Sequence, residues 1–155
     1  MRAMLIACAA VLAACAPKAA EETVSPASPP AQHAERLPAP TPSGVTQRIT
    51  ADDNGKTITV PVGSTFAVQL VGVPTAGYLW GVADKPAFLS DAQESGGDTT
   101  TAQSQPGFTG GNHWEVFAFQ AQSAGEGVLK LEQRRPWEPK TEPATQTFSV
   151  TIRAQ

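Results

Sequence analysis

The residues with the chemistry for catalysis or metal binding are few and scattered. The 155-residue chain has two histidines, His33 and His113, and two cysteines, Cys8 and Cys15. No pair of them has the spacing of a zinc site such as HExxH or CxxC, and the chain has no GxSxG turn and no phosphate-binding GxxxxGK(S/T) loop. His113 could act as a general base only beside an orienting partner, and the sequence supplies no candidate. We therefore expect no enzyme, no metal and no cofactor.

The cysteines point to a different kind of chemistry. Arg2 precedes an apolar run at 5–12 that is too short to span a bilayer. The run ends in the sequence LAAC at 12–15, whose last residue is Cys15. This arrangement looks like the lipobox of bacterial lipoproteins. We expect residues 1–14 to be a signal peptide and Cys15 to carry lipid, which would hold the protein to a membrane of the cell envelope, at the outer membrane or facing the periplasm. The alternative is an ordinary signal peptide that is cleaved elsewhere.

Residues 15–44 have the composition of a tether. Seven of the 14 prolines fall there among alanine, serine and threonine, so the segment can bury too little apolar surface to offset the entropy of ordering. We expect a disordered spacer, partly polyproline II, with His33 in solvent. The formal net charge is −3, and without a basic stripe nucleic acid is not an expected partner.

Residues 45–155 alternate apolar and polar side chains with the period of β-strands. The clearest alternations lie at 57–60, 66–71, 129–132 and 148–153, and glycine, proline and aspartate cluster between such segments. The Asn54-Gly55 pair in front of the first run predicts a hairpin turn. No stretch has helical spacing for more than one turn. About 110 residues of short strands favour a single all-β domain, an immunoglobulin-like β-sandwich.

Three segments of this domain are unusual for simple connections. They read VPTAGY at 73–78, PGFTGGN at 106–112 and RRPWEP at 134–139. Turn formation explains Pro74 and Gly77 in the first segment. It does not explain Trp137, which stands among prolines where a strand ladder cannot form. A tryptophan on a rigid loop offers a large contact area at a small entropic cost, which is typical of a binding hot spot.

In this order and spacing, the segments resemble the loops of the chagasin-like inhibitors of papain-family cysteine proteases. That family carries an NPTTGY-type loop, a glycine-rich loop and an RPW loop on an immunoglobulin-like sandwich, and the resemblance covers about residues 50 to 153. It implies three loops at one end of the sandwich, with the first inside the protease cleft and the others astride it. The expected partner is a papain-like cysteine protease, bound reversibly and without a covalent bond by a monomeric inhibitor.

The resemblance also implies roles for single residues. Thr75 matches the threonine that lies against the catalytic cysteine, and Trp137 matches the tryptophan that packs beside the cleft. The implied protease-binding residues are Pro74, Thr75, Ala76, Gly77, Tyr78, Gly110, Gly111, Arg135, Pro136 and Trp137. The chain departs from the family at Val73, where an asparagine would brace the turn, at Ala76 in place of a threonine, and at Phe108 in place of a glycine.

A non-inhibitory envelope module that binds a protein or a glycan through the same loops is the alternative. The position of the loops separates the two hypotheses. An inhibitor of this kind needs all three loops at one end of the domain and the indole of Trp137 in solvent.

Overall fold

The computed structural model describes residues 34–155. The expected signal peptide, the expected lipid site at Cys15 and the expected tether up to His33 lie outside these residues. Within residues 34–155, no helix is long and apolar enough to cross a membrane. In the same residues, no three His, Cys, Asp or Glu side chains gather closely enough to hold a metal ion.

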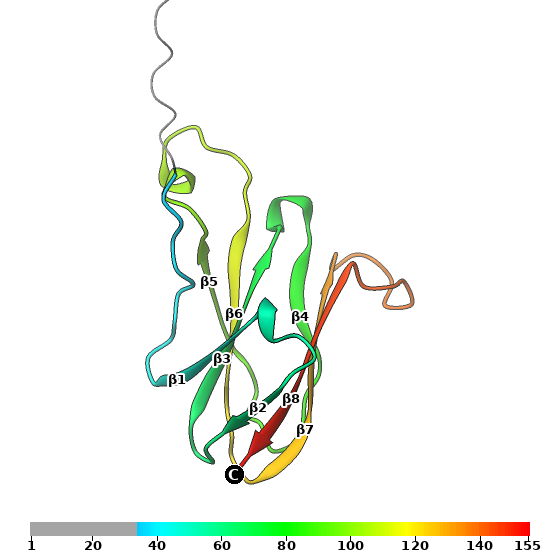
Figure 1. The fold of residues 1–155 in the computed structure, drawn as a ribbon. Helices are drawn as coiled ribbons and strands as arrows, with labels where there is room; N and C mark the ends of the chain where they lie inside the picture. The colour runs from blue at the N-terminus through cyan, green and yellow to red at the C-terminus, as the bar shows by residue number, and fades with distance from the viewer. Residues whose placement is uncertain (1–33) are drawn as a thin grey trace, which may run out of the picture. The chain divides into compact units, whose positions relative to one another are not determined.

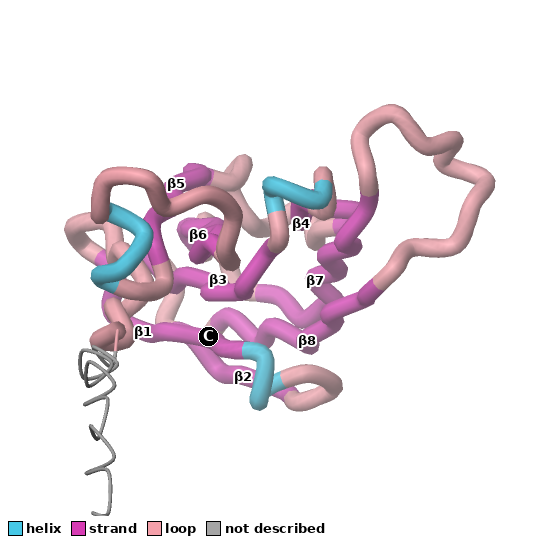
Figure 2. Tube along the Cα trace, turned by 90° about the horizontal axis from the view of Figure 1, so that it is seen from above, coloured by secondary structure: helices cyan, strands magenta, loops and turns pink. Residues whose placement is uncertain are grey.

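In residues 34–155, eight strands form two four-stranded sheets, which lie as two layers (Figures 1 and 2). The strands are β1 (Val45–Thr50), β2 (Thr57–Val60), β3 (Thr65–Gly72), β4 (Leu79–Asp84), β5 (Gln93–Asp98), β6 (His113–Gln120), β7 (Gly125–Arg134) and β8 (Gln146–Ala154). The first sheet has the order β1-β3-β6-β5 and the second has the order β2-β8-β7-β4. The 3₁₀ segments η1 (Ala51–Asp53), η2 (Pro74–Ala76) and η3 (Thr101–Ser104) lie between strands. The predicted all-β sandwich is confirmed.

The period-2 alternation of the sequence builds the core between the sheets. On β3, Phe66, Val68 and Leu70 are all buried in the same cluster. The ring of Phe66 stacks on that of Phe119 in β6, with centroids 5.6 Å apart. The second sheet contributes Leu129, Leu131, Phe148, Val150 and Ile152. Burial of one such side chain contributes about 1.5–3 kcal/mol, so a domain without a cysteine can be stable on packing alone.

The turn at Asn54-Gly55 is not the tip of a hairpin, and that prediction is wrong. β1 pairs in parallel with β3, whereas β2 pairs in parallel with β8, so the two strands flanking the turn belong to different sheets. The Asn54 Oδ1 atom accepts a hydrogen bond from the Ser149 amide on β8, at 2.8 Å, which fixes the crossing. Gly55 has a φ of 79°. An Asn-Gly pair suits a sheet-to-sheet turn as well as a hairpin, so local sequence could not distinguish them.

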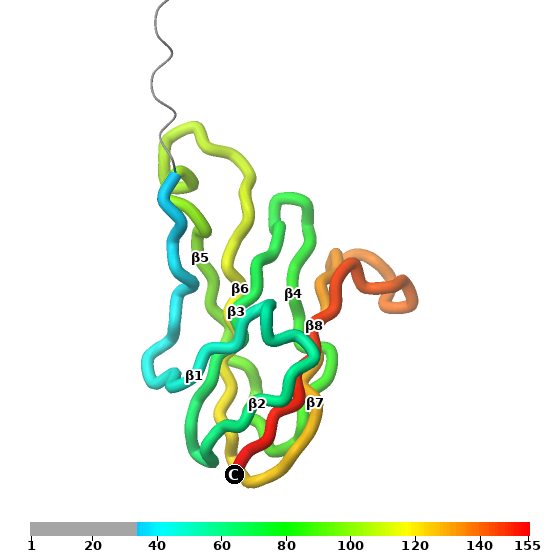
Figure 3. Tube along the Cα trace, viewed as in Figure 1, coloured from blue at the N-terminus to red at the C-terminus, as the bar shows by residue number. Residues whose placement is uncertain are grey.

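Part of the predicted disordered tether is ordered, and the prediction is wrong for residues 34–44. Residues 34–44, which the sequence assigns to the tether, run along the first sheet from the 99–112 loop to β1 (Figure 3). The Leu37 amide donates to the Thr99 carbonyl at 2.9 Å. Prolines here do not prevent order, because an extended chain can pack on a sheet face without forming a ladder of its own.

Candidate functional site

Three loops lie at one end of the sandwich (Figure 1). The central loop (73–78) joins β3 to β4, the glycine loop (99–112) joins β5 to β6, and the tryptophan loop (135–145) joins β7 to β8. Seen from that end, the central loop lies between the other two (Figure 2). The three segments that the sequence singles out are therefore brought together.

The central loop is closed by its own backbone. Val73 and Tyr78 exchange hydrogen bonds of 3.1 and 3.2 Å across its base. Pro74 begins the 3₁₀ turn η2, and Gly77 ends it in the left-handed conformation, with a φ of 80°. No side chain caps the turn at Val73, so the missing asparagine is replaced by backbone pairing rather than by another side chain. Thr75 is exposed at the tip, on a short and rigid turn.

Arg135 ties the tryptophan loop to the central loop. Its Nε atom donates to the Ala76 carbonyl at 3.2 Å, and its guanidinium carbon lies 4.4 Å from the centroid of the Tyr78 ring. Glu138 pairs with the same guanidinium at 3.4 Å. A planar cation that donates and stacks at once orients both loops, which a lysine could not do.

Trp137 is exposed, with 69% of its surface accessible to solvent. Its ring lies over Gly77, and a Cβ atom at that glycine would overlap the indole. Position 77 therefore requires glycine for two reasons, the positive φ of its backbone and the close approach of the indole ring. An exposed indole that is already held in place loses little freedom when a partner covers it.

The glycine loop is organised by Gln103, at the third residue of η3. Its Oε1 atom accepts the amides of Thr99 and Thr100 at 2.8 and 3.0 Å, and its Nε2 atom donates to the Asn112 carbonyl at 2.9 Å. One amide thus joins the two sides of the loop at its base. Gly110 and Gly111 both have positive φ, 89° and 103°, and Phe108 is 42% exposed.

A half-buried glutamate, Glu115, lies below the central loop. The Trp80 amide donates to Glu115 Oε2 at 2.8 Å, whereas Glu115 Oε1 is buried with no hydrogen-bond partner among residues 34–155. Burial raises the pKa of Glu115 above its ordinary value, against the opposing hydrogen bond from Trp80. The carboxylate occupies the space where a side chain at Gly72 would stand. Glu115 therefore couples the first sheet to the start of β4.

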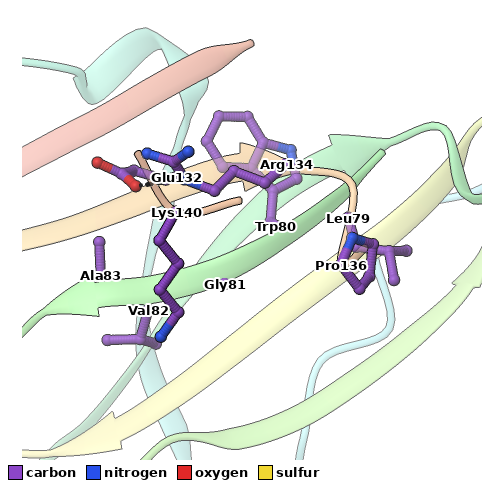
Figure 4. Close-up of a pocket in the computed structure, with 9 residues that line it drawn as sticks. All are labelled: Leu79, Trp80, Gly81, Val82, Ala83, Glu132, Arg134, Pro136 and Lys140. Atoms are coloured by element: carbon purple, nitrogen blue, oxygen red, sulfur yellow. Dashed lines mark hydrogen bonds and ion pairs between the residues drawn. The ribbon is translucent and has the colours of Figure 1, made fainter. Parts of the chain in front are cut away.

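An open groove runs beside the tryptophan loop on the second sheet (Figure 4). Leu79, Gly81 and Ala83 of β4 line it, and Pro136 and Lys140 border it from the loop. The Arg134 Nε atom contacts Glu132 Oε2 at 2.8 Å along the groove. This pair and the Lys140 ammonium add charged groups to a lining of Leu79, Ala83 and Pro136, and the groove extends the surface that a partner on the tryptophan loop would meet.

His113 has a carboxylate neighbour, which the sequence did not identify. Its Nε2 atom lies 3.7 Å from Asp98 Oδ1. Ser104 donates to the other Asp98 oxygen at 3.2 Å rather than to the imidazole. Ser104 and His113 are therefore not paired as a nucleophile and its base, as acyl transfer would require.

Sequence reasoning missed Gln103, Glu115 and the part of the chain before Val45. The Thr100-x-x-Gln103 spacing is a capping box, and it could have identified Gln103. Glu115 gave no signal, because an acidic residue in an alternating strand reads as solvent-facing.

Comparisons with known proteins converge on one family. A family model described as "Chagasin family peptidase inhibitor I42" matches residues 59–152. The curated protein amoebiasin-1 of Entamoeba histolytica is 36% identical over 105 residues, which are 67% of this chain and 97% of that protein.

Solved structures with the same fold agree. The solution structure of Amebosin is 31% identical, with a TM-score of 0.57, and the match covers 70% of this chain and 97% of that one. The crystal structure of the cysteine protease inhibitor EhICP2 from Entamoeba histolytica has a TM-score of 0.59 at 19% identity, and the match covers 72% of this chain and all of that one.

Proposed function

This chain belongs to the chagasin family of peptidase inhibitors, and from that premise we propose a reversible, non-covalent block of papain-like cysteine proteases. In this proposal the central loop enters the active-site cleft, and the glycine loop and the tryptophan loop contact the enzyme on either side. The observation that carries the proposal is the arrangement of one end of the sandwich: a closed central loop with Thr75 exposed, and beside it the exposed indole of Trp137.

The shape of the central loop suits a block without cleavage. A papain-like cleft is a narrow groove with an activated thiolate at its floor. Thr75 and Ala76 are small and exposed, so the backbone between them can approach that floor closely. A 3₁₀ turn presents no extended peptide bond to the thiolate. Because the turn is already formed, little loop entropy is lost on docking.

The tryptophan loop supplies the expected anchor. An interface of standard size buries about 800 Å² on each partner, and a few aromatic or arginine residues carry most of its energy. Trp137 has this chemistry, and Arg135 holds its loop against the central loop. Pro136 and the groove beside it would extend the contact.

The experiment that tests the proposal is inhibition of papain by the intact chain. We expect the change Trp137→Ala to weaken inhibition by about 2 kcal/mol or more, which is roughly thirtyfold, while the unfolding midpoint stays unchanged because the indole is exposed. Val62→Ala is the matched control, since Val62 is 45% exposed in the turn between β2 and β3, away from the three loops. Absence of papain inhibition at micromolar concentration would refute the proposal.

We also propose that the chain is exported and anchored to a membrane of the cell envelope through lipid on Cys15. The support is the LAAC sequence after an apolar run, followed by a proline-rich segment. A multiply acylated cysteine binds a bilayer firmly, whereas a single chain gives only marginal binding.

A further inference from the structure

The N-terminal arm, defined as residues 35–42, contacts the glycine loop at its base. The Leu37 amide donates to the Thr99 carbonyl at 2.9 Å. The Thr101 amide donates to the Glu35 carbonyl at 2.9 Å, and the Glu35 amide donates to Thr101 Oγ1 at 3.2 Å. Arg36 and Thr100 form an antiparallel bridge. The arm therefore pairs with the chain where it leaves β5, an edge strand of the first sheet, and enters the loop.

The arm is also packed on the outer face of the first sheet. The Trp114 Nε1 atom donates to the Leu37 carbonyl at 2.9 Å, and Gln69 Nε2 donates to Thr41 Oγ1 at 3.1 Å. Ala39 covers a second apolar cluster, made of Ala67, Val116 and Ala118. The small side chains on this face leave room for an extended segment. These contacts make the arm part of the folded domain.

The glycine loop needs support from outside itself. At residues 99–112 it is longer than the central loop (73–78) and the tryptophan loop (135–145). Three of its glycines have positive φ. Gln103 joins its two sides, but that amide bonds only within the loop. On the β6 side, the loop runs into a strand with neighbours on both edges, whereas on the β5 side it follows an edge strand. The arm supplies the missing neighbour on that side.

We propose that the N-terminal arm is a positioning element of the inhibitor: it holds the glycine loop in the orientation that binds the protease, without touching the enzyme. The proposal rests on the proposed function of the three loops. The arm lies before residues 59–152, the part of the chain that the family model matches. Without it, the base of the loop must be ordered during binding, and affinity falls by the cost of that ordering.

The test compares three variants of the full chain. One lacks residues 35–42, a control lacks the equally long segment 22–29, and Trp114→Phe removes the donor to Leu37 while keeping an aromatic ring. The readouts are the inhibition constant for papain and hydrogen exchange of the amides at 101–112 in the free protein. We expect the arm deletion to weaken inhibition about tenfold, the equivalent of ordering one or two loop side chains. Trp114→Phe weakens it less, both variants speed exchange in the loop, and the control changes neither readout.

Each other outcome overturns the proposal or assigns the effect elsewhere. Faster loop exchange with an unchanged inhibition constant would mean that the arm supports only the fold. Weaker inhibition with unchanged exchange would mean that the arm itself touches the enzyme. Should the deletion unfold the domain, the inhibition constant and loop exchange of Trp114→Phe decide between these two outcomes. Failure of the intact chain to inhibit papain would refute the proposed function, whereas equal inhibition constants for the intact and deleted chains would refute the role of the arm alone.

Discussion

At the scale of single residues, the site depends on side chains that hold loops to one another. Arg135 reaches the carbonyl of Ala76 and the ring of Tyr78, and Trp137 lies over Gly77. The tryptophan and central loops are therefore one surface before any partner arrives. The sequence predicted that Trp137 would be exposed, from the prolines around it, and this is confirmed. It could not predict that the indole would rest on Gly77, because that contact joins residues 60 positions apart.

The contact between Gly77 and Trp137 predicts a specific defect. Gly77→Ala places a Cβ against the indole and strains a left-handed residue, whereas Gly63→Ala strains a residue with a φ of 83° that has nothing within 4 Å. We expect both variants to lose about 1–2 kcal/mol of unfolding free energy, and only Gly77→Ala to weaken papain inhibition. Urea unfolding and inhibition assays measure the two effects. Equal inhibition by both variants would show that the indole does not need its position over Gly77.

Glu115 predicts how stability depends on pH. Because its pKa is raised by burial, the folded chain holds this proton more tightly than the unfolded chain. The contribution of Glu115 to the free energy of unfolding is therefore largest below about pH 4.3, the pKa of an unperturbed glutamate. That contribution falls as pH rises from there through the higher pKa of the folded state. Hydrogen bonds lower the pKa values of Asp53 and Glu126. These two groups therefore stabilise the fold above the pKa of the unfolded side chain, and that contribution is lost as pH falls.

Glu115→Gln should therefore remove the loss of stability as pH rises from 4 toward neutral. The glutamine keeps an acceptor for the Trp80 amide, so the fold is expected to persist. Chemical unfolding at a series of pH values measures the slope. Parallel slopes for the two proteins would contradict the assignment.

At the scale of elements, the strands with apolar alternation were predictable and the others were not. Phe66, Val68 and Leu70 marked β3 correctly, because one face of that strand fills the core. β5 reads QESGGD and has no apolar residue, so no pattern marked it; pairing with β6 makes it a strand. Composition also hid the N-terminal arm, since prolines signal disorder but tolerate packing on a sheet. The glycine loop was identified as a segment, but its organising residue was not.

Gln103 is the element-scale test of that loop. Gln103→Ala removes the acceptor for Thr99 and Thr100 and the donor to Asn112, whereas Gln103→Glu keeps the acceptor alone. We expect Gln103→Ala to lower the unfolding free energy by about 1–2 kcal/mol, to speed hydrogen exchange at 99–112 and to weaken papain inhibition. Gln103→Glu should lie between it and the unaltered chain. An inhibition constant that is unchanged in both variants would show that the glycine loop does not take part in the proposed interface.

At the scale of the whole molecule, the sandwich gathers its three loops at one end and so keeps recognition apart from stability (Figure 3). The core lies between the sheets, and the loop tips contribute little to it. Loop residues can therefore change without loss of the fold, which is why a family with a shared sandwich can vary its binding surface. The position of the three loops at one end was predicted from the family resemblance. The alternation of apolar and polar residues predicted only the sandwich.

The proposed anchor is tested on the full chain in a bacterial host. We expect the protein to fractionate with membranes and to gain the mass of acyl chains at Cys15, and Cys15→Ser to release it into the soluble fraction. Papain inhibition by Cys15→Ser in solution should match that of the detergent-solubilised protein, because Cys15 lies outside the domain that carries the loops. An unlipidated wild-type protein in the soluble fraction would refute the anchor.

The place where the chain enters the domain has a consequence for that anchor. The arm begins beside Thr101, so the polypeptide leaves at the end that carries the three loops rather than at the far end. About 20 residues separate it from Cys15, a span of at most roughly 70 Å when fully extended. The connection toward Cys15 and the three loops therefore lie at the same end of the domain. In the proposed anchored form, this length would limit how far from the bilayer a captured protease can lie.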